Sequence, residues 1–144
     1  MKAFTAAVLA AGVIIAIPGG DAVAQDAAKG EIVFKTCMVC HRIGPNAKNL
    51  VGPVLNDVIG RQAGTIPGFR YSALNKHAGE NGLVWSEEFI FEYLADPNAF
   101  LKKFLTEKGK PELAVGATLM PIKLPNEQQR KDVIAYLKKF SPPK

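Results

Sequence analysis

The chain has 144 residues, of which 48% are hydrophobic and 22% are charged, and its formal net charge is +5 at pH 7. This length predicts one folded domain. After residue 24 no segment has the roughly 20 apolar residues that a bilayer-spanning helix needs, which excludes stable membrane insertion of the folded part.

Residues 1–24 have the pattern of a secretory signal peptide. A positively charged start precedes an uncharged apolar run over residues 3–17, and residues 22–24 (A-V-A) form an A-x-A cleavage site. The run is too short for a comfortable membrane span, and an uncleaved anchor is the alternative. We therefore expect the signal peptide to be cleaved and residues 25–144 to form one domain in an oxidising compartment.

The basic excess lies in the C-terminal part of the chain. Residues 25–96 carry seven basic and eight acidic side chains, whereas residues 97–144 carry ten basic and four acidic ones. For an exported protein we expect no nucleic-acid partner. The basic part favours steering towards an acidic protein surface. The alternative is a solvated lysine-rich face that only keeps the protein soluble.

Apolar spacing, capping residues and turn residues predict short helices separated by long loops. In chain order we expect a helix over 26–38, loops over 43–70, a short helix over 72–77, a helix capped by Ser86 that runs to 95, a helix that begins at Asp96-Pro97, an irregular stretch over 105–118 and a last helix capped by Asn126.

No segment has a convincing alternating strand pattern, so the predicted fold class is all-α, with about three to five short helices. Long loops cost conformational entropy that short helices alone rarely offset. A large apolar group at the centre of the fold would solve this problem, because the loops could then wrap around it.

Residues 36–41 read T-C-M-V-C-H, and C-x-x-C-H is the attachment signature of c-type haem. Two thiols three residues apart lie near one edge of a helical turn, where both can form thioether links to the haem vinyl groups. The next residue projects its imidazole towards the iron. Cys37 and Cys40 are therefore the predicted attachment points, and His41 is the predicted proximal ligand.

Three other interpretations of this segment compete with haem attachment. A thiol-redox site is one, but the following histidine and the lack of a βαβ pattern argue against a thioredoxin-like fold. A tetrahedral zinc site would need His77 as well as Cys37, Cys40 and His41, and the last two are adjacent in the chain. A structural disulfide across so short a loop would be strained and would close almost no loop.

A haem iron has a second axial position, for which the chain offers few candidates. Met1 leaves with the signal peptide, and Met38 lies inside the attachment turn on the His41 side of the ring plane. Met120 lies in a loop (GATLMPIKLP) and is the predicted sixth ligand, although a lone methionine is more often core packing. His77 is the rival, and its polar, glycine-rich surroundings favour a solvated side chain. A filled sixth position favours electron transfer, and a thioether ligand raises the reduction potential.

Taken together, these motifs resemble those of the class I c-type cytochromes, close to the cytochrome c2 and mitochondrial cytochrome c branch. The resemblance covers nearly all of residues 25–144. Its elements are G-x-x-x-F at Gly30 and Phe34, the haem motif at 37–41, Gly52-Pro53, Gly60-Arg61, PGFRYSALNK at 67–76, Trp85, EYLADP at 92–97, the loop of Met120, and DVIAYLKK at 132–139.

This resemblance implies a cytochrome c fold wrapped around one covalently bound haem c, and it assigns roles to matching residues. The carbonyl of Pro53 would accept a hydrogen bond from His41. Arg61, Tyr71 and Trp85 would contact the haem propionates, since an unpaired buried carboxylate is costly. Asn75, Tyr93 and Thr118 would line the polar side of the pocket near Met120. Gly30 and Phe34 would pack on the last helix near Val133 and Tyr136.

The implied function is that of a soluble, monomeric, periplasmic single-electron carrier and not an enzyme. It would shuttle electrons from a cytochrome bc1 complex to a photosynthetic reaction centre or a terminal oxidase, through transient contacts with acidic docking faces. The lysines expected around the haem edge are Lys35, Lys102, Lys103, Lys110 and Lys123. The alternatives are a haem peroxidase, a thiol-disulfide oxidoreductase that uses Cys37 and Cys40, and a haem-based gas sensor.

The sequence also departs from the mitochondrial pattern. Extra residues lie between Tyr71 and Trp85, and a longer insert lies between Pro97 and Met120. Leu119 stands in place of the usual lysine, Ile122 stands in place of an aromatic residue, and one residue is missing before the first cysteine. These departures bear on the shape of the docking face.

Overall fold

The computed structural model of the protein describes residues 24–142, so most of the expected signal peptide lies outside the described residues. The helices are short, as expected. They are α1 (Ala27–Cys37), α2 (Ala73–Glu80), α3 (Glu87–Ala95), α4 (Pro97–Glu107), the single 3-10 turn η1 (Pro111–Leu113) and α5 (Glu127–Lys138).

The all-α prediction is confirmed. Within residues 24–142 the β-structure is limited to one isolated bridge between Gln62 and Val84. In the same part of the chain, no helix combines the length and apolar character needed to cross a membrane. Two boundaries differ from the sequence prediction: the helix after Ser72 continues to Glu80, and α4 continues to Glu107, into the stretch expected to be irregular.

Each α-helix start is fixed by a capping side chain. The predicted caps are present, because Ser86 accepts from the backbone N–H of Phe89 and Asn126 accepts from that of Gln129, both at 3.0 Å. Asp96 caps α4, with Pro97 at its first position, where a missing N–H costs nothing. Short helices therefore begin at defined residues although their intrinsic stability is low.

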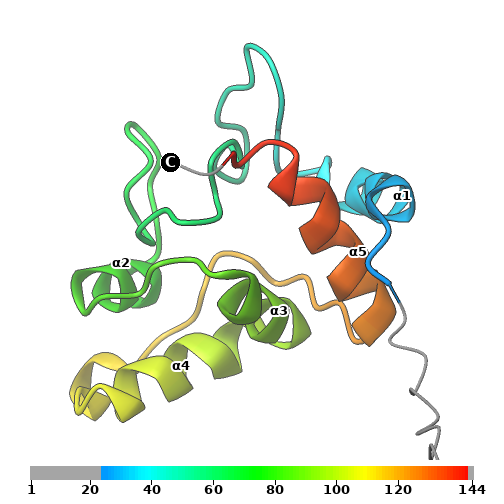
Figure 1. The fold of residues 1–144 in the computed structure, drawn as a ribbon. Coiled ribbons are helices and arrows are strands. Elements are labelled where there is room, and N and C mark those ends of the chain that lie inside the picture. The colour runs from blue at the N-terminus through cyan, green and yellow to red at the C-terminus, as the bar shows by residue number, and fades with distance from the viewer. Residues whose placement is uncertain (1–23, 143–144) are drawn as a thin grey trace, which may run out of the picture.

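The closest helix pair is formed by α1 and α5, which lie side by side although they are at opposite ends of the chain (Figure 1). Gly30 permits the contact, since a Cβ there would overlap the backbone carbonyl of Asp132. One turn later the ring of Phe34 packs on Tyr136, with centroids 5.2 Å apart. The predicted packing of Gly30 and Phe34 on the last helix is thus present.

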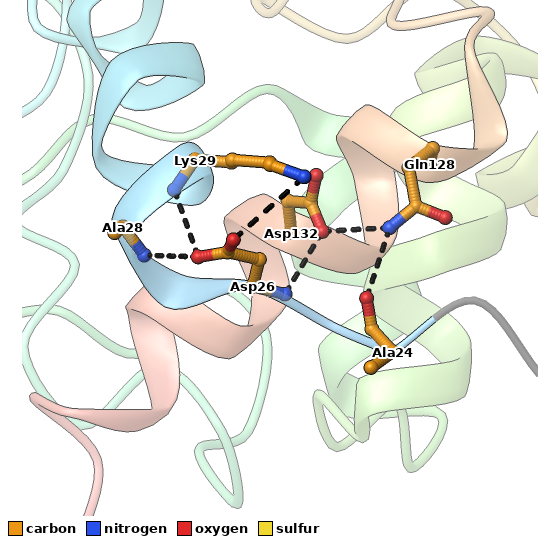
Figure 2. A network of polar contacts seen from close by, with 6 residues as sticks. All are labelled: Ala24, Asp26, Ala28, Lys29, Gln128 and Asp132. Atoms are coloured by element: carbon orange, nitrogen blue, oxygen red, sulfur yellow. Dashed lines mark hydrogen bonds and ion pairs between the residues drawn. The ribbon is translucent and has the colours of Figure 1, made fainter.

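A hydrogen-bond network fastens the start of α1 to α5 (Figure 2). The carboxylate of Asp132 is 3% exposed and accepts from the backbone N–H of Asp26 at 2.9 Å and from the Gln128 amide at 2.8 Å. These donors offset the cost of burying a carboxylate. The same Gln128 amide donates to the carbonyl of Ala24 at 3.3 Å. The network holds the chain just before α1 against α5.

An aromatic cluster joins α3 and α4 on the other side of the molecule. The ring of Trp85 meets Tyr93 edge-on at 4.8 Å, and Phe100 packs between Trp85 and Phe104. In Figure 1, α3 lies against α4, with α2 at the far end of α4. The helices thus form two groups, the pair α1 and α5 and the set α2, α3 and α4. Because α3 also contacts α5, it joins the two groups.

Replacing Gly30 by alanine tests the α1–α5 contact. The added methyl group would meet backbone, which cannot rotate away, so overpacking should outweigh the gain in helix propensity and lower the free energy of unfolding by about 2 kcal/mol. Urea unfolding of the holoprotein measures the change. Lys29→Ala, on the same helix with an exposed side chain, is the control and should have little effect. A Gly30→Ala protein as stable as the parent would contradict the contact.

Candidate functional site

The turn that follows α1 carries the two cysteines. The carbonyl of Cys37 accepts from the backbone N–H groups of Cys40 and His41, at 3.0 and 2.9 Å. This tight turn places all three side chains at the wall of one cavity. The two cysteines do not form a disulfide with each other and are half-buried, and burial raises the pKa of the Cys37 thiol above its ordinary value. A raised pKa disfavours the thiolate that redox chemistry needs.

The cavity lies between the two helix groups and is largely apolar. It encloses about 1220 Å³ of space between atoms, part of it open to solvent. Its wall draws on α1, α2, α3, α5 and the loops between them, so a large flat molecule could contact many parts of the chain at once. All predicted site residues line it, namely Cys37, Cys40, His41, Pro53, Arg61, Tyr71, Asn75, Trp85, Tyr93, Thr118 and Met120. The topology therefore brings them together, while the role of each stays a prediction.

His41 is held on the cavity wall in one orientation. Its Nδ1 lies 2.7 Å from the carbonyl oxygen of Pro53. A carbonyl can only accept, so Nδ1 carries the proton and Nε2 keeps its lone pair. Burial lowers the pKa of His41, and the charge of Arg61 lowers it further, against the opposing effect of the Pro53 contact. The imidazole is therefore neutral near pH 7, which is the form that binds a metal.

Gly52, which precedes Pro53, makes this arrangement possible. A Cβ at this position would lie 2.5 to 2.9 Å from three atoms of the His41 ring. The backbone N–H of Gly52 also donates to the carbonyl of Cys40 at 2.7 Å. The Gly52-Pro53 segment therefore packs directly against the turn that carries Cys40 and His41. The sequence pointed to Pro53 by resemblance, but the tight contact of Gly52 with the ring became visible only in the structure.

Met120 lies in a loop without regular secondary structure, residues 114–126, which we call the Met120 loop. Its side chain is half-buried and lines the same cavity as His41. The two rival side chains do not line it: His77 lies in α2, and Met38 is 47% exposed. Of the methionine and histidine candidates for a second axial ligand in the described chain, Met120 is the one in reach of the cavity.

Polar groups gather on part of the cavity wall. Arg61 Nη1 donates to the carbonyl of Asn56 at 2.8 Å, and burial lowers the pKa of the guanidinium despite the opposing effect of Tyr71. Burial raises the pKa of Tyr93, and the side chains of Thr118 and Asn75 act in the opposite direction. Asn75 Oδ1 is buried without a hydrogen-bond partner in the protein. Buried polar atoms are almost always partnered, so the Asn75 amide has spare hydrogen-bonding capacity at the cavity wall.

The residues present fit a haem. Two cysteines stand at the cavity edge, a neutral imidazole and a thioether line the wall, and a polar region can meet carboxylates. Most of the remaining wall is apolar and comes from all parts of the chain: Phe34, Val51, Leu55, Val58, Phe69, Ile90, Leu94, Leu119, Ile122, Val133 and Leu137. Apolar spacing predicted the last helix, but it could not show that Val133 and Leu137 of that helix line a cavity.

The chain is similar to known proteins, and the matched regions cover almost the whole length of those proteins. No family model matches the chain. Cytochrome c2 iso-1 of Rhodospirillum centenum is 69% identical over 116 residues, which are 81% of this chain and 97% of that protein. A cytochrome c2 of Rhodopseudomonas palustris is 69% identical over 113 residues, 78% of this chain and 96% of that protein.

Solved structures agree with these relatives. The cytochrome c2 structure from Rhodospirillum centenum has a TM-score of 0.80 and 67% identity, and covers 81% of this chain and 99% of that one. The ferricytochrome c2 structure from Rhodopseudomonas palustris has a TM-score of 0.77 and 63% identity, with the same coverage. Cysteines at 37 and 40 fit the attachment of one haem c. The chain therefore belongs to the cytochrome c2 family, among the class I c-type cytochromes.

Proposed function

We propose that this electron carrier of the cytochrome c2 family binds its haem iron through His41 and Met120. The observation that carries the proposal is that these two side chains, from distant parts of the chain, line one cavity from which His77 and Met38 are absent. The neutral, oriented imidazole of His41 is ready to ligate. The half-buried thioether of Met120 needs no deprotonation to do so.

The chemistry that the bound haem supplies is a reversible change between ferrous and ferric iron. The chain's contribution is to set the potential and to restrict access. A neutral, soft thioether favours ferrous iron, and an apolar wall disfavours the extra charge of the ferric state. If His41 and Met120 both held the iron, no position would remain for a substrate. This distinguishes the proposed carrier from a haem peroxidase or a gas sensor.

We propose that the polar residues of the cavity wall bind the polar edges of the haem. Arg61, Tyr71 and Trp85 would receive the propionates, because a guanidinium, a phenol and an indole N–H are donors that a buried carboxylate needs. The ordinary alternative for the two aromatic residues is core packing, and Trp85 does pack on Tyr93. Asn75, Tyr93 and Thr118 would form the polar side near Met120.

The proposed partners are membrane redox complexes with acidic docking faces, bc1 on one side and a reaction centre or oxidase on the other, contacted transiently by a monomer. The five lysines expected at the haem edge do not share one environment. Lys103 Nζ lies 3.4 Å from Glu92 and 3.9 Å from Glu107, and Lys123 Nζ lies 2.6 Å from Asp96. Among residues 24–142, the ion pairs do not involve Lys35, Lys102 or Lys110. These three would carry more of the steering field.

We also propose a periplasmic location, with residues 1–24 removed and residues 25–144 forming the working domain. The position of Asp26 supports this boundary, since the N-cap of the first helix follows the expected cleavage site by two residues. The bond from Asp26 to Asp132 would survive cleavage. The weaker contact of Gln128 with the Ala24 carbonyl would not.

The oxidised visible spectrum tests the axial ligands. The ferric protein should show the weak far-red band of sulfur-to-iron charge transfer, and Met120→Ala should abolish it because it removes the thioether. His77→Ala is the matched control and should leave the band unchanged. A wild-type protein without the band, or a band that survives in Met120→Ala, would refute the assignment.

Salt and charge variants test the docking proposal. Electron transfer from a detergent-solubilised bc1 complex to the ferric protein, followed by stopped-flow absorbance, should slow as ionic strength rises. At low salt Lys102→Gln should slow association about 2-fold, and Lys103→Gln less, because Glu92 and Glu107 already offset the Lys103 charge. Rates independent of salt, or equal effects of the two variants, would argue against steering by the unpaired lysines.

Mass spectrometry tests the domain boundary. Protein recovered from the periplasm of an expressing bacterium should have the mass of residues 25–144 plus one haem. Ala24→Phe should retain the signal peptide, because the cleavage site requires small residues. Exported wild-type protein that keeps residues 1–24 would show that the segment is an anchor instead.

A further inference from the structure

The Met120 loop has to be held in place by contacts outside itself. Residues 114–126 form no helix or strand, so their backbone groups need partners elsewhere. The Cys37–His41 turn is different, because it continues directly from α1. Its backbone N–H groups at Cys40 and His41 bond the carbonyl of Cys37 within the same turn. The position of Met120 therefore depends on whatever fastens its loop.

Two consecutive hydrogen bonds connect Met120 to the first turn of α4. The Asn98 side chain accepts, through Oδ1, from the backbone N–H of Thr118 at 2.9 Å. The Thr118 hydroxyl in turn accepts from the backbone N–H of Met120 at 3.2 Å. Both contacts are partly buried, so water replaces them poorly when they are lost. They form a chain from Asn98 through Thr118 to the methionine.

The platform that carries Asn98 is itself fixed. Asp96 caps α4 by accepting from the backbone N–H of Ala99 at 3.0 Å. Pro97 is buried at the first helical position and restricts the backbone there. Asn98 follows on this rigid start. Its half-buried side chain points at the loop from a helix terminus that has little freedom to move.

The other end of the loop is fastened independently. The backbone N–H of Leu124 donates to the carbonyl of Leu94 at 2.7 Å, and the buried Arg130 donates to the carbonyls of Leu124 and Pro125, both at 2.8 Å. The ion pair of Lys123 with Asp96 is exposed, and such pairs contribute little. Between Met120 and these anchors the chain can still shift, so the upstream side depends on Asn98.

We propose that Asn98 is a positioning residue for the sixth haem ligand: by holding Thr118, it keeps the Met120 loop closed over the cavity. The proposal rests on the proposed ligation by Met120. Asn98 does not line the cavity and touches no reacting atom. Its effect is on the population of open states, in which the thioether has moved away and an external ligand can enter.

Imidazole binding to the ferric holoprotein measures this population. An external ligand binds only the open state, so its apparent affinity rises in proportion to the open fraction. Losing one partly buried hydrogen bond should raise that fraction about 3- to 10-fold, and Asn98→Ala should bind imidazole more tightly by the same factor. The readout is loss of the far-red sulfur-to-iron band during titration.

Three further variants separate positioning from general stability. Asn98→Asp keeps the acceptor oxygen and should bind imidazole like the wild type. Thr118→Val breaks the next contact in the chain and should resemble Asn98→Ala, which also keeps the test available if one variant folds poorly. Asn81→Ala is the control, because Asn81 Nδ2 donates to the His77 carbonyl at 2.8 Å, away from the Met120 loop. It should lower stability without changing imidazole affinity.

The outcomes also distinguish this proposal from the ligand assignment. If the far-red band is absent from wild type or persists in Met120→Ala, the ligation itself fails. If the band behaves as expected but Asn98→Ala and Thr118→Val bind imidazole within 2-fold of wild type, the positioning role is wrong. Asn98→Asp behaving like Asn98→Ala, or Asn81→Ala matching either, would also overturn it.

Discussion

The contact between α1 and α5 is the constraint on which the site depends. Gly30 allows the two backbones to touch, and the buried Asp132 carboxylate fastens the start of α1 to α5. One end of this pair carries Cys37, and one face of α5 supplies Val133 and Leu137 to the cavity wall. A change in the distance between the helices would therefore move the attachment turn relative to the wall it faces. Contacts between chain ends are entropically costly to form, so their precision needs the dense packing seen at Gly30 and Phe34.

The two sides of the cavity are held by different kinds of interaction. On the histidine side a helix end, a tight turn and the Gly52-Pro53 segment fix the ring of His41 within a few residues of the expected covalent links. On the methionine side, one hydrogen bond each to α3 and α4 and two from Arg130 of α5 hold an irregular loop. Local opening occurs where contacts are few and individually weak. The Met120 side is thus the part of the cavity wall at which local opening would begin.

Local rules made much of this structure predictable. The C-x-x-C-H spacing is set by one helical turn, and Ser86 and Asn126 act on backbone groups three residues away, so neither needs tertiary information. The end of α4 was missed because residues 105–107 continue a helix that Phe104 and Leu105 bury, which is a tertiary effect. Gly52 contacts His41, and Asn98 contacts Thr118, although the partners are separated by 11 and 20 positions in the sequence. No periodicity or capping rule refers to such pairs, so the sequence could not reveal them.

The ion pairs also change how the basic excess can act. A charge count treats every lysine alike, but the field felt by a distant partner depends on net charge over about a Debye length. Lys103 and Lys123 have carboxylates within 4 Å, so each contributes mostly a dipole at that range.

The local effect of these two lysines is different: Lys103 bridges α3 and α4, while Lys123 joins the Met120 loop to the α3–α4 junction. The insert between Pro97 and Met120 therefore contributes lysines outside the ion pairs of residues 24–142 and also the platform that holds the Met120 loop. Because Lys102 lies outside the ion pairs of residues 24–142 and Asn98 is uncharged, substitutions can in principle change partner association and loop closure separately.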